Sequence, residues 1–210
     1  MGIVLTAVDE TLANAWATFC GDAPGVRVHR GSILELRCDA VVSPANSFGF
    51  MDGGIDLAYR QRFGRQVQER VQGAIVERRY GELLVGDALI VETGDPDLPF
   101  LIAAPTMRVP MMVRDTPNAY LAARAVFLLI KHGRFDDGTP VASRVASVAL
   151  PGLATGIGRM GPATCAHQVR RAIDDVLGDG YHLPRTWAEA SERHQLLYTD
   201  RLRRLQHDGG

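Results

Sequence analysis

The chain has 210 residues, of which 46% are apolar and 22% are charged, and its formal net charge is −1. This length suits one domain with a substantial core and is short for two. The near-neutral charge gives no strong signal for nucleic acid or an anionic membrane, so a bound anion would have to be held by local geometry.

Six short runs rich in Val, Ile and Leu, each bounded by residues such as Gly, Pro or Asp, are typical of strands. Several of them lack polar alternation, as do strands that are buried on both faces of a sheet. In chain order, these runs cover residues 3–8, 25–29, 39–43, 88–93, 100–104 and 145–150.

Amphipathic stretches alternate with the strands. Apolar residues recur every four positions from Ile55 to Ile75, and Gly64 is a candidate break that would divide this stretch into two helices. This alternation predicts an α/β fold with helices on both faces of a mostly parallel sheet. Further helices are expected over 9–20, 116–133, 161–180 and 186–206, the last packing through Trp187, Leu196, Leu197 and Leu202.

Two glycine-rich loops follow predicted strands, where α/β proteins place their ligands. "PANSFGFMDGGID" begins at Pro44, and "PGLATGIGRMGPATC" begins at Pro151. Glycine lets backbone N–H groups approach a ligand, and such groups ahead of a helix form an anion-binding nest. Glycines after strands often only make turns, and neither loop spells a P-loop or GxGxxG motif. Two such loops side by side could nevertheless clamp a diphosphate.

The segment "DAVVSPANSFGFMDGGIDLAY" resembles the macrodomain signature, in which an Asp-Ala-hydrophobic strand runs into an Asn-Ala-Ala-Asn loop, a glycine-rich turn and Val/Ile-Asp. "GSI" at 31–33 is similar to the family's Gly-Asp-Ile, and "LPGLATGIGRMGPATC" is similar to its second, phosphate-holding loop. The likeness runs from about residue 25 to 178. It implies a three-layer α/β/α fold with a central mixed, mostly parallel sheet over 1–180, and leaves 181–210 as a C-terminal helical extension. The implied partner is ADP-ribose or an ADP-ribosylated macromolecule.

The resemblance also implies site residues. Asp56 corresponds to the acidic residue that several hydrolytic members place near the scissile bond, and Asn46 to the asparagine that hydrogen-bonds the distal ribose. The other ligand-binding residues that it implies are Ser32, Ile33, Gly53, Gly54, Ile55, Thr155, Gly156, Ile157, Gly158 and Arg159.

Four positions depart from the family pattern. Ser32 stands where most members have an Asp that grips the adenine amino group, and Ser43 replaces the first Asn of the Asn-Ala-Ala-Asn loop. Gly158 and Arg159 stand where many members have an aromatic residue and a glycine. The run Gly-Ile-Gly-Arg is closer to the branch that removes ADP-ribose from glutamate, which has an Asp at the position of Gly158. The sequence therefore mixes features of two branches.

The implied roles compete with simpler ones. A carboxylate at Asp56, in the first turn of a predicted helix, also favours the helix dipole. Asn46 is of a type that makes turns, and Arg159 could bind a phosphate or point into solvent. The segment 104–111, "APTMRVPM", could line the distal end of the cleft or pack as a stiff loop over the core.

Three functions remain after this reading. The favoured one is a hydrolase that removes ADP-ribose from a modified protein or processes an ADP-ribose derivative through water attack at the distal ribose, and Asp56 supports it. Ser43 and Gly158 favour a non-catalytic reader of ADP-ribose instead. Ser32 allows a binder of another nucleotide.

Cysteine use and the chain's first residues point to the cytoplasm. Cys20, Cys38 and Cys165 are far apart, so we expect three buried, reduced thiols, and neither they nor the six histidines have metal-ligand spacing. We expect no metal and no cofactor. The first residues lack a basic segment and a long apolar core, so no signal peptide is expected, and no apolar run is long enough to span a bilayer. The oligomeric state is left open.

Overall fold

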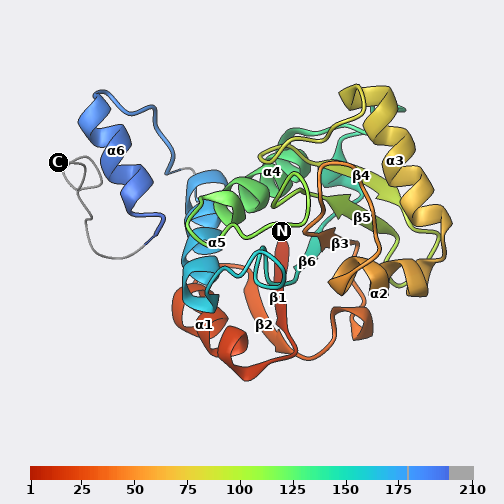
Figure 1. Ribbon diagram of the computed structural model, residues 1–210, viewed down its shortest axis with the longest axis horizontal. Coiled ribbons are helices and arrows are strands. Elements are labelled where there is room, and N and C mark those ends of the chain that lie inside the picture. The colour runs from red at the N-terminus through yellow and green to blue at the C-terminus, as the bar shows by residue number, and fades with distance from the viewer. Residues whose placement is uncertain (179, 199–210) are drawn as a thin grey trace.

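The computed structural model describes residues 1–178 and 180–198, which form a three-layer α/β/α arrangement with one extending helix (Figure 1). Among these residues, six strands make one sheet in the order β2-β1-β6-β3-β5-β4. The strands are β1 (Gly2–Ala7), β2 (Val26–Arg30), β3 (Ala40–Ser43), β4 (Leu89–Glu92), β5 (Phe100–Ala103) and β6 (Ser147–Leu150).

The sheet is parallel except at one edge, where β4 pairs with β5 in the antiparallel sense. The central strands are almost wholly buried, which explains why their sequences are continuous apolar runs and not alternating ones. The predicted α/β fold with a mixed, mostly parallel sheet is confirmed, and each of the six predicted strands is present.

Helices cover both faces of the sheet. Trp16, Phe127 and Val169 pack against one face, while Tyr59 and Val71 pack against the other. The helices are α1 (Glu10–Cys20), α2 (Gly54–Phe63), α3 (Gln66–Arg79), α4 (Asn118–His132), α5 (Pro162–Val176) and α6 (Trp187–Gln195), with short 3-10 turns at Ile33–Glu35 and Val141–Ser143.

Gly64 divides the long apolar stripe as predicted. It lies between α2 and α3 with φ +86°, a backbone conformation that residues with a side chain rarely adopt. The three cysteines are buried, also as predicted, and burial raises the pKa of each thiol, to about 12 for Cys20 and Cys165 and about 11 for Cys38.

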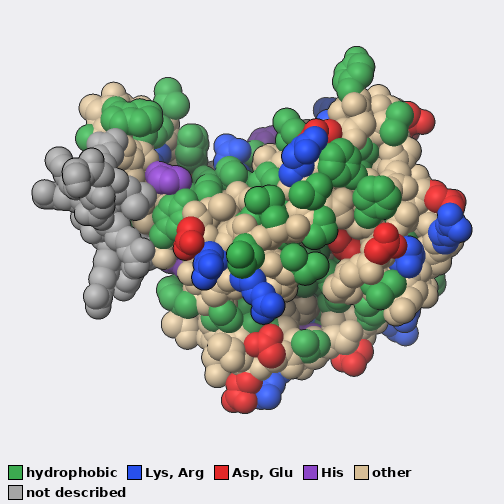
Figure 2. All heavy atoms as spheres, viewed as in Figure 1, with side chains coloured by type: hydrophobic (Ala, Val, Ile, Leu, Met, Phe, Trp, Pro, Cys, Tyr) green, Lys and Arg blue, Asp and Glu red, His purple; other side chains and the backbone are tan. Residues whose placement is uncertain are grey.

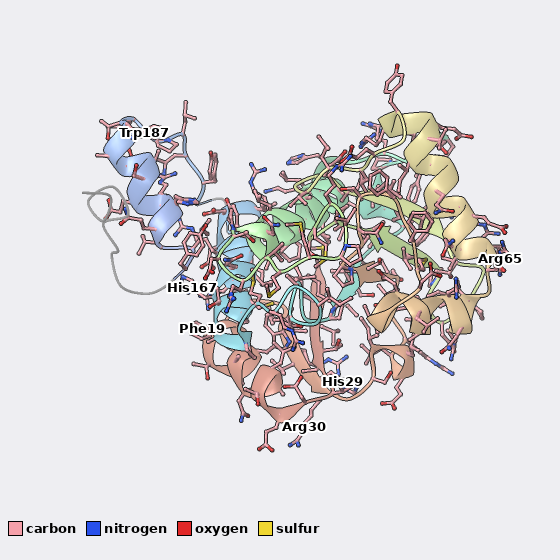
Figure 3. The ribbon with its side chains drawn as sticks, viewed as in Figure 1. Phe19, His29, Arg30, Arg65, His167 and Trp187 are labelled. Carbon is pink, nitrogen blue, oxygen red and sulfur yellow. The ribbon has the colours of Figure 1, made fainter. Side chains whose placement is uncertain are left out.

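The C-terminal helix corrects one expectation. Trp187 does not pack on the domain, because 76% of it is exposed. The segment instead meets α5 at its other end, where the His167 ring contacts the Leu196 carbonyl and Leu197 is buried. Trp187 opens α6 and is therefore carried away from the domain (Figure 3). Leu202 and the end of the predicted helix over 186–206 lie outside the described residues. No helix in the described part of the chain has both the length and the hydropathy to cross a membrane.

Candidate functional site

Three loops meet at the carboxyl edge of the parallel strands. Loop one (44–53) follows β3, and loop two (151–161) follows β6, which pairs with β3. Loop three (104–117) follows β5, the other neighbour of β3. In Figure 1 they are the orange, teal and yellow-green loops in the middle of the view. The sheet order therefore brings together the two glycine-rich loops that the sequence singles out, which is where α/β folds bind ligands.

Asp56 lies at the centre of this edge, in the first turn of α2. It is 9% exposed, and its carboxylate accepts a hydrogen bond of 2.6 Å from the Ser43 hydroxyl at the end of β3. Burial raises the pKa of Asp56 from its ordinary value near 3.8 to about 6, and the Ser43 bond opposes this rise. A carboxyl group with such a pKa changes its protonation state close to neutral pH, as a general base does.

The helices that follow the glycine loops both begin without a side-chain cap. Gly53 precedes α2 and Gly161 precedes α5, and no side chain accepts a capping bond from the N–H groups at either helix start. A side chain at Gly53, Gly54 or Gly156 would meet no atom within 4 Å, so space lies open beside these three backbones. Unsatisfied N–H groups at a helix start, next to open space, suit an anion such as a phosphate.

The Asn46 side chain makes its hydrogen bonds within loop one. Its amide oxygen accepts from the backbone N–H groups of Phe48 and Phe50, at 3.1 and 3.3 Å, and its amide nitrogen donates to the Phe50 carbonyl at 2.8 Å. In this structure Asn46 therefore makes the turn that was the simpler of its two expected roles. The amide nitrogen uses one of its two N–H groups in this turn, so the second N–H is available to donate to a ribose hydroxyl.

The predicted ligand-binding residues of loop two differ in their exposure to solvent. Gly156 and Ile157 are exposed at its tip, Thr155 is half-buried, and Gly158 is buried. Arg159 is exposed at φ +57°, and its guanidinium has no partner among the described residues.

Gly158 is held against loop three. Its carbonyl accepts a 2.8 Å bond from the Val113 N–H, and a side chain there would lie 2.5 Å from the Ala154 carbonyl and 2.9 Å from Val113. This conformation of loop two therefore excludes the aromatic residue and the Asp that the two family branches carry at this position. The packing of Val113 explains the departure.

Ser32 and Ile33 lie beyond the end of β2, at the outer side of the same edge. The Ser32 hydroxyl caps a 3-10 turn by accepting from the Leu34 N–H at 3.2 Å. Ile33 is 3% exposed and packs in the core beneath α2 and α3, together with the half-buried Ile55. Only the backbone of Ile33 is placed to face a ligand.

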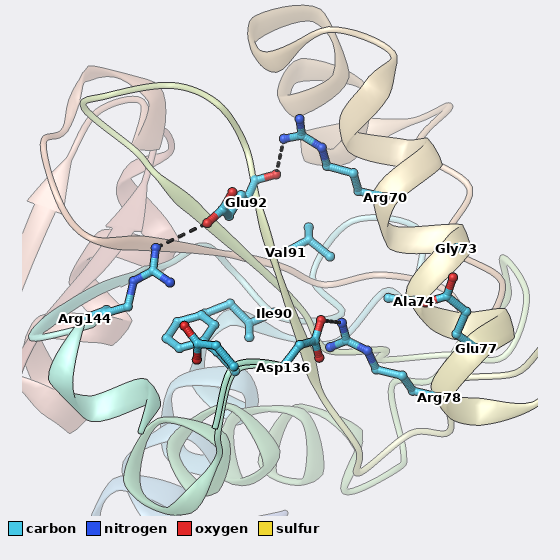
Figure 4. A pocket seen from close by; sticks show the side chains of 12 residues that line it. Arg70, Gly73, Ala74, Glu77, Arg78, Ile90, Val91, Glu92, Asp136 and Arg144 are labelled. Carbon is cyan, nitrogen blue, oxygen red and sulfur yellow. Dashed lines mark hydrogen bonds and ion pairs between the residues drawn. The ribbon is translucent and has the colours of Figure 1, made fainter. Parts of the chain in front are cut away.

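A hollow of about 540 Å³ lies elsewhere, between α3, β4 and the 135–144 segment (Figure 4). The arginines around it are engaged by the protein itself. Arg70 donates to the Glu92 carbonyl at 2.7 Å, Arg144 pairs with the Glu92 carboxylate at 3.2 Å, and Arg78 pairs with Asp136. Because its arginines are engaged and no glycine loop lines it, we place the candidate site at the three loops.

Two contacts of this site could not be predicted from the sequence. The bond between Ser43 and Asp56 depends on how α2 returns over the end of β3, so Ser43 was visible only as a departure from a pattern. The contact of Val113 with Gly158 joins two loops that are far apart in the chain. A polar residue closing a buried strand was the one available signal for Ser43.

Comparisons with known proteins agree with this geometry. The model of the family described as "Macro domain" matches residues 42–169. The chain is 30% identical to an uncharacterized protein of Aeropyrum pernix over 72% of this chain and 71% of that protein. It is 31% identical to an uncharacterized protein of Aquifex aeolicus over 63% of this chain and 71% of the relative.

Solved structures share the fold. The macrodomain of Mycobacterium tuberculosis DarG superposes with a TM-score of 0.57 at 22% identity, over 70% of this chain and 88% of that one. A mutant macrodomain of Oceanobacillus iheyensis with ADPR gives 0.58 at 17% identity, over 70% and 75% of the two chains. The Trypanosoma brucei macrodomain in complex with ADP-ribose gives 0.52 at 18% identity, over 71% of this chain and 58% of that one.

Proposed function

The chain belongs to the Macro domain family, and from this premise we propose that it binds ADP-ribose between loops one and two and hydrolyses the bond joining ADP-ribose to a modified protein or a small derivative. The observation that carries this proposal is Asp56. A carboxyl group that is 9% exposed, has a pKa of about 6 and lies beside two open glycine loops is poorly explained as a helix-dipole residue.

The glycine loops would hold the diphosphate. The open backbones at Gly53, Gly54 and Gly156 leave room for phosphate oxygens close to N–H groups, and both following helices start uncapped. Backbone N–H groups and helix starts bind anions without requiring a lysine. Arg159, exposed and without a partner in the described part of the chain, would add a cation at the rim.

Asp56 would act as the general base. A water molecule attacks the anomeric carbon of the distal ribose, its proton passes to the Asp56 carboxylate, and the electrons of the broken bond leave with the former acceptor group. Such a carbon develops oxocarbenium character, so a weak nucleophile suffices if the substrate is held in position. Ser43 keeps the carboxylate oriented through its 2.6 Å bond.

The substitution Asp56→Asn tests the proposal. We expect calorimetry to show ADP-ribose binding within a few-fold of the wild type, whereas turnover of an ADP-ribosylated protein falls by about 10²–10⁴, the range for loss of a positioned base. Unchanged turnover would remove Asp56 from the mechanism. Wild-type binding without any turnover of modified substrates would leave the reader function, which Ser43 and Gly158 favour.

Ser32 bears on the third candidate, a binder of another nucleotide. Ser32→Asp retains a side-chain oxygen that can cap the turn at Leu34 and adds a carboxylate toward the base. If adenine is read there, ADP-ribose affinity should rise by about tenfold, the value of a charged over a neutral hydrogen bond. Equal affinities of the two proteins, with GDP-ribose or UDP-sugars competing as well as ADP-ribose, would favour the other nucleotide.

A further inference from the structure

Five exposed apolar side chains lie on the loops of the candidate site. They come from all three loops and are 44–63% exposed, and we refer to them as the apolar rim: Phe50, Val109, Met111, Met112 and Ile157. Isolated apolar residues are normal on a surface, but a cluster on converging loops marks an interaction site. Hydrophobic side chains gather in the middle of the face shown in Figure 2, where the three loops of Figure 1 run.

Hydrogen bonds hold loop three between the two ligand loops. At one end the Arg108 carbonyl accepts from the Ser47 N–H of loop one at 3.1 Å, and at the other the Val113 N–H donates to Gly158 of loop two at 2.8 Å. The four residues between these anchors, 109–112, are all exposed. Loop three is therefore anchored at both ends: Ala104, Met107 and Val113 pack in the core, while residues 109–112 present two methionines to solvent.

The charges near the rim do not suit nucleic acid. Arg108 pairs with Glu82 at 2.7 Å, Arg60 pairs with Asp52, and Arg114 has Asp115 at 3.7 Å. Arg159 alone among these cations lacks a partner in the described residues. Nucleic-acid surfaces need a track of free cations, one for each neutralised phosphate. Methionine and aromatic side chains with few free charges are instead typical of surfaces that bind polypeptides, and methionine adapts to varied partners.

We propose that the apolar rim docks the polypeptide that carries the ADP-ribose, through apolar residues flanking the modified side chain, while the ADP-ribose itself enters between loops one and two. This inference rests on the proposed function, and it names the substrate class: modified protein in preference to a small ADP-ribose derivative or modified nucleic acid.

The test compares ligands that differ only beside the ADP-ribose. Two synthetic peptides carry ADP-ribose on one side chain through a non-hydrolysable bond, one with Leu, Val and Met as flanking residues and one with Gly and Ser. Calorimetry measures both, together with free ADP-ribose and an ADP-ribosylated oligonucleotide. For the wild type we expect the apolar peptide to bind about tenfold more tightly than free ADP-ribose, and the Gly/Ser peptide to match free ADP-ribose.

The double variant Met111→Ser/Met112→Ser should lose that tenfold advantage and keep its affinity for free ADP-ribose, which also shows that it is folded. Val76→Ser/Leu84→Ser is the matched control, because these side chains are 65% and 61% exposed but lie outside the three loops. It should behave as the wild type with every ligand.

Each other outcome is decisive. Equal affinity of the wild type for both peptides and free ADP-ribose overturns the docking proposal alone. A gain for the oligonucleotide that the methionine variant loses assigns the rim to nucleic acid and also overturns it. Loss of free ADP-ribose binding by the folded methionine variant would make the rim part of the nucleotide site. Absence of ADP-ribose binding by the wild type overturns the proposed function, and this inference with it.

Discussion

The bond between Ser43 and Asp56 links the pH dependence of the proposed hydrolysis to one pair of side chains. In the proposed role of general base, Asp56 works only when ionised, and burial raises its pKa to about 6. We therefore expect turnover to rise from about pH 5 and to level off above about pH 7, with a midpoint near that pKa. Initial rates with a modified protein across this range give the profile.

Ser43→Ala moves that profile in a known direction. The Ser43 hydroxyl stabilises the ionised carboxylate, so its removal leaves burial unopposed and raises the pKa of Asp56 further. The acid limb should shift toward higher pH. Ser47→Ala is the control, since Ser47 is equally buried in loop one and does not bond to Asp56. If Ser43→Ala leaves the midpoint of the acid limb unchanged, a group other than Asp56 determines that limb.

The buried Asp56 carboxylate should also lower the free energy of unfolding at neutral pH. Its folded-state pKa of about 6 lies above the value near 3.9 of an unfolded chain, so the folded state holds a proton more tightly. The free energy of unfolding therefore falls as the pH rises from about 4 to about 6, and stays lower above that. Asp56→Asn removes the buried charge and should stabilise the protein by up to about 2–3 kcal/mol at pH 7.5, less the cost of its buried amide. Urea unfolding at pH 7.5 and pH 4.5 measures this, and the gain should fall to about one third at the lower pH, which lies between the two pKa values. A variant less stable at both would contradict the burial argument.

At the scale of elements, loop two depends on two glycines for different reasons. Gly158→Ala places a methyl group 2.5 Å from the Ala154 carbonyl of the same loop and 2.9 Å from Val113, so the backbone of loop two must change and Val113 must move. We expect a loss of about 1–3 kcal/mol in unfolding free energy and at least a tenfold loss of ADP-ribose affinity. Denaturation and calorimetry on the same sample measure both quantities.

Gly156→Ala is the matched comparison, because a methyl group there meets nothing within 4 Å. It should leave stability within about 0.5 kcal/mol of the wild type, as surface substitutions do. If ADP-ribose occupies the space beside this backbone, its affinity should fall even though the fold is intact. If Gly158→Ala has the stability and ADP-ribose affinity of the wild type, Val113 and the loop backbone move away from the added methyl group at little cost.

The elements were predictable because their signals are local. The apolar composition of runs such as 39–43 and 100–104 predicts buried strands, and Gly64, which has no side chain, predicts a break between two helices. For the site, the sequence predicts which loops form it but not the contacts that their side chains make. Whether Asn46 bonds a ligand or its own loop depends on the distance to Phe50. An aromatic residue predicts packing in general but does not indicate which end of a helix meets the domain, so the exposure of Trp187 could not be predicted. Contacts of that kind are set by tertiary structure.

At the scale of the whole molecule, the C-terminal segment leaves the domain beside α5, and its Tyr198 lies near Asp115 of loop three. The segment from residue 180 is held largely by its own contacts: Thr186 caps α6, and Glu189 pairs with Arg193 at 2.8 Å. It meets the domain through His167 on α5, through the buried Leu197, and through Tyr181, whose ring lies 5.6 Å from the Arg124 guanidinium on α4. In Figure 1, α6 extends from the side of the domain that α5 covers.

Removal of residues 181–210 should therefore leave a folded macrodomain. We expect a loss of about 1–3 kcal/mol in unfolding free energy, the value of burying one leucine and its neighbours, and ADP-ribose affinity within about twofold of the full chain. One contact argues for measuring the affinity as well as the stability. Burial and then the nearby Asp115 carboxylate raise the pKa of Tyr198, and Asp115 belongs to loop three. A tenfold loss of ADP-ribose affinity on truncation, with the domain still folded, would mean that the extension positions loop three and that residues 1–180 do not make the complete binding unit.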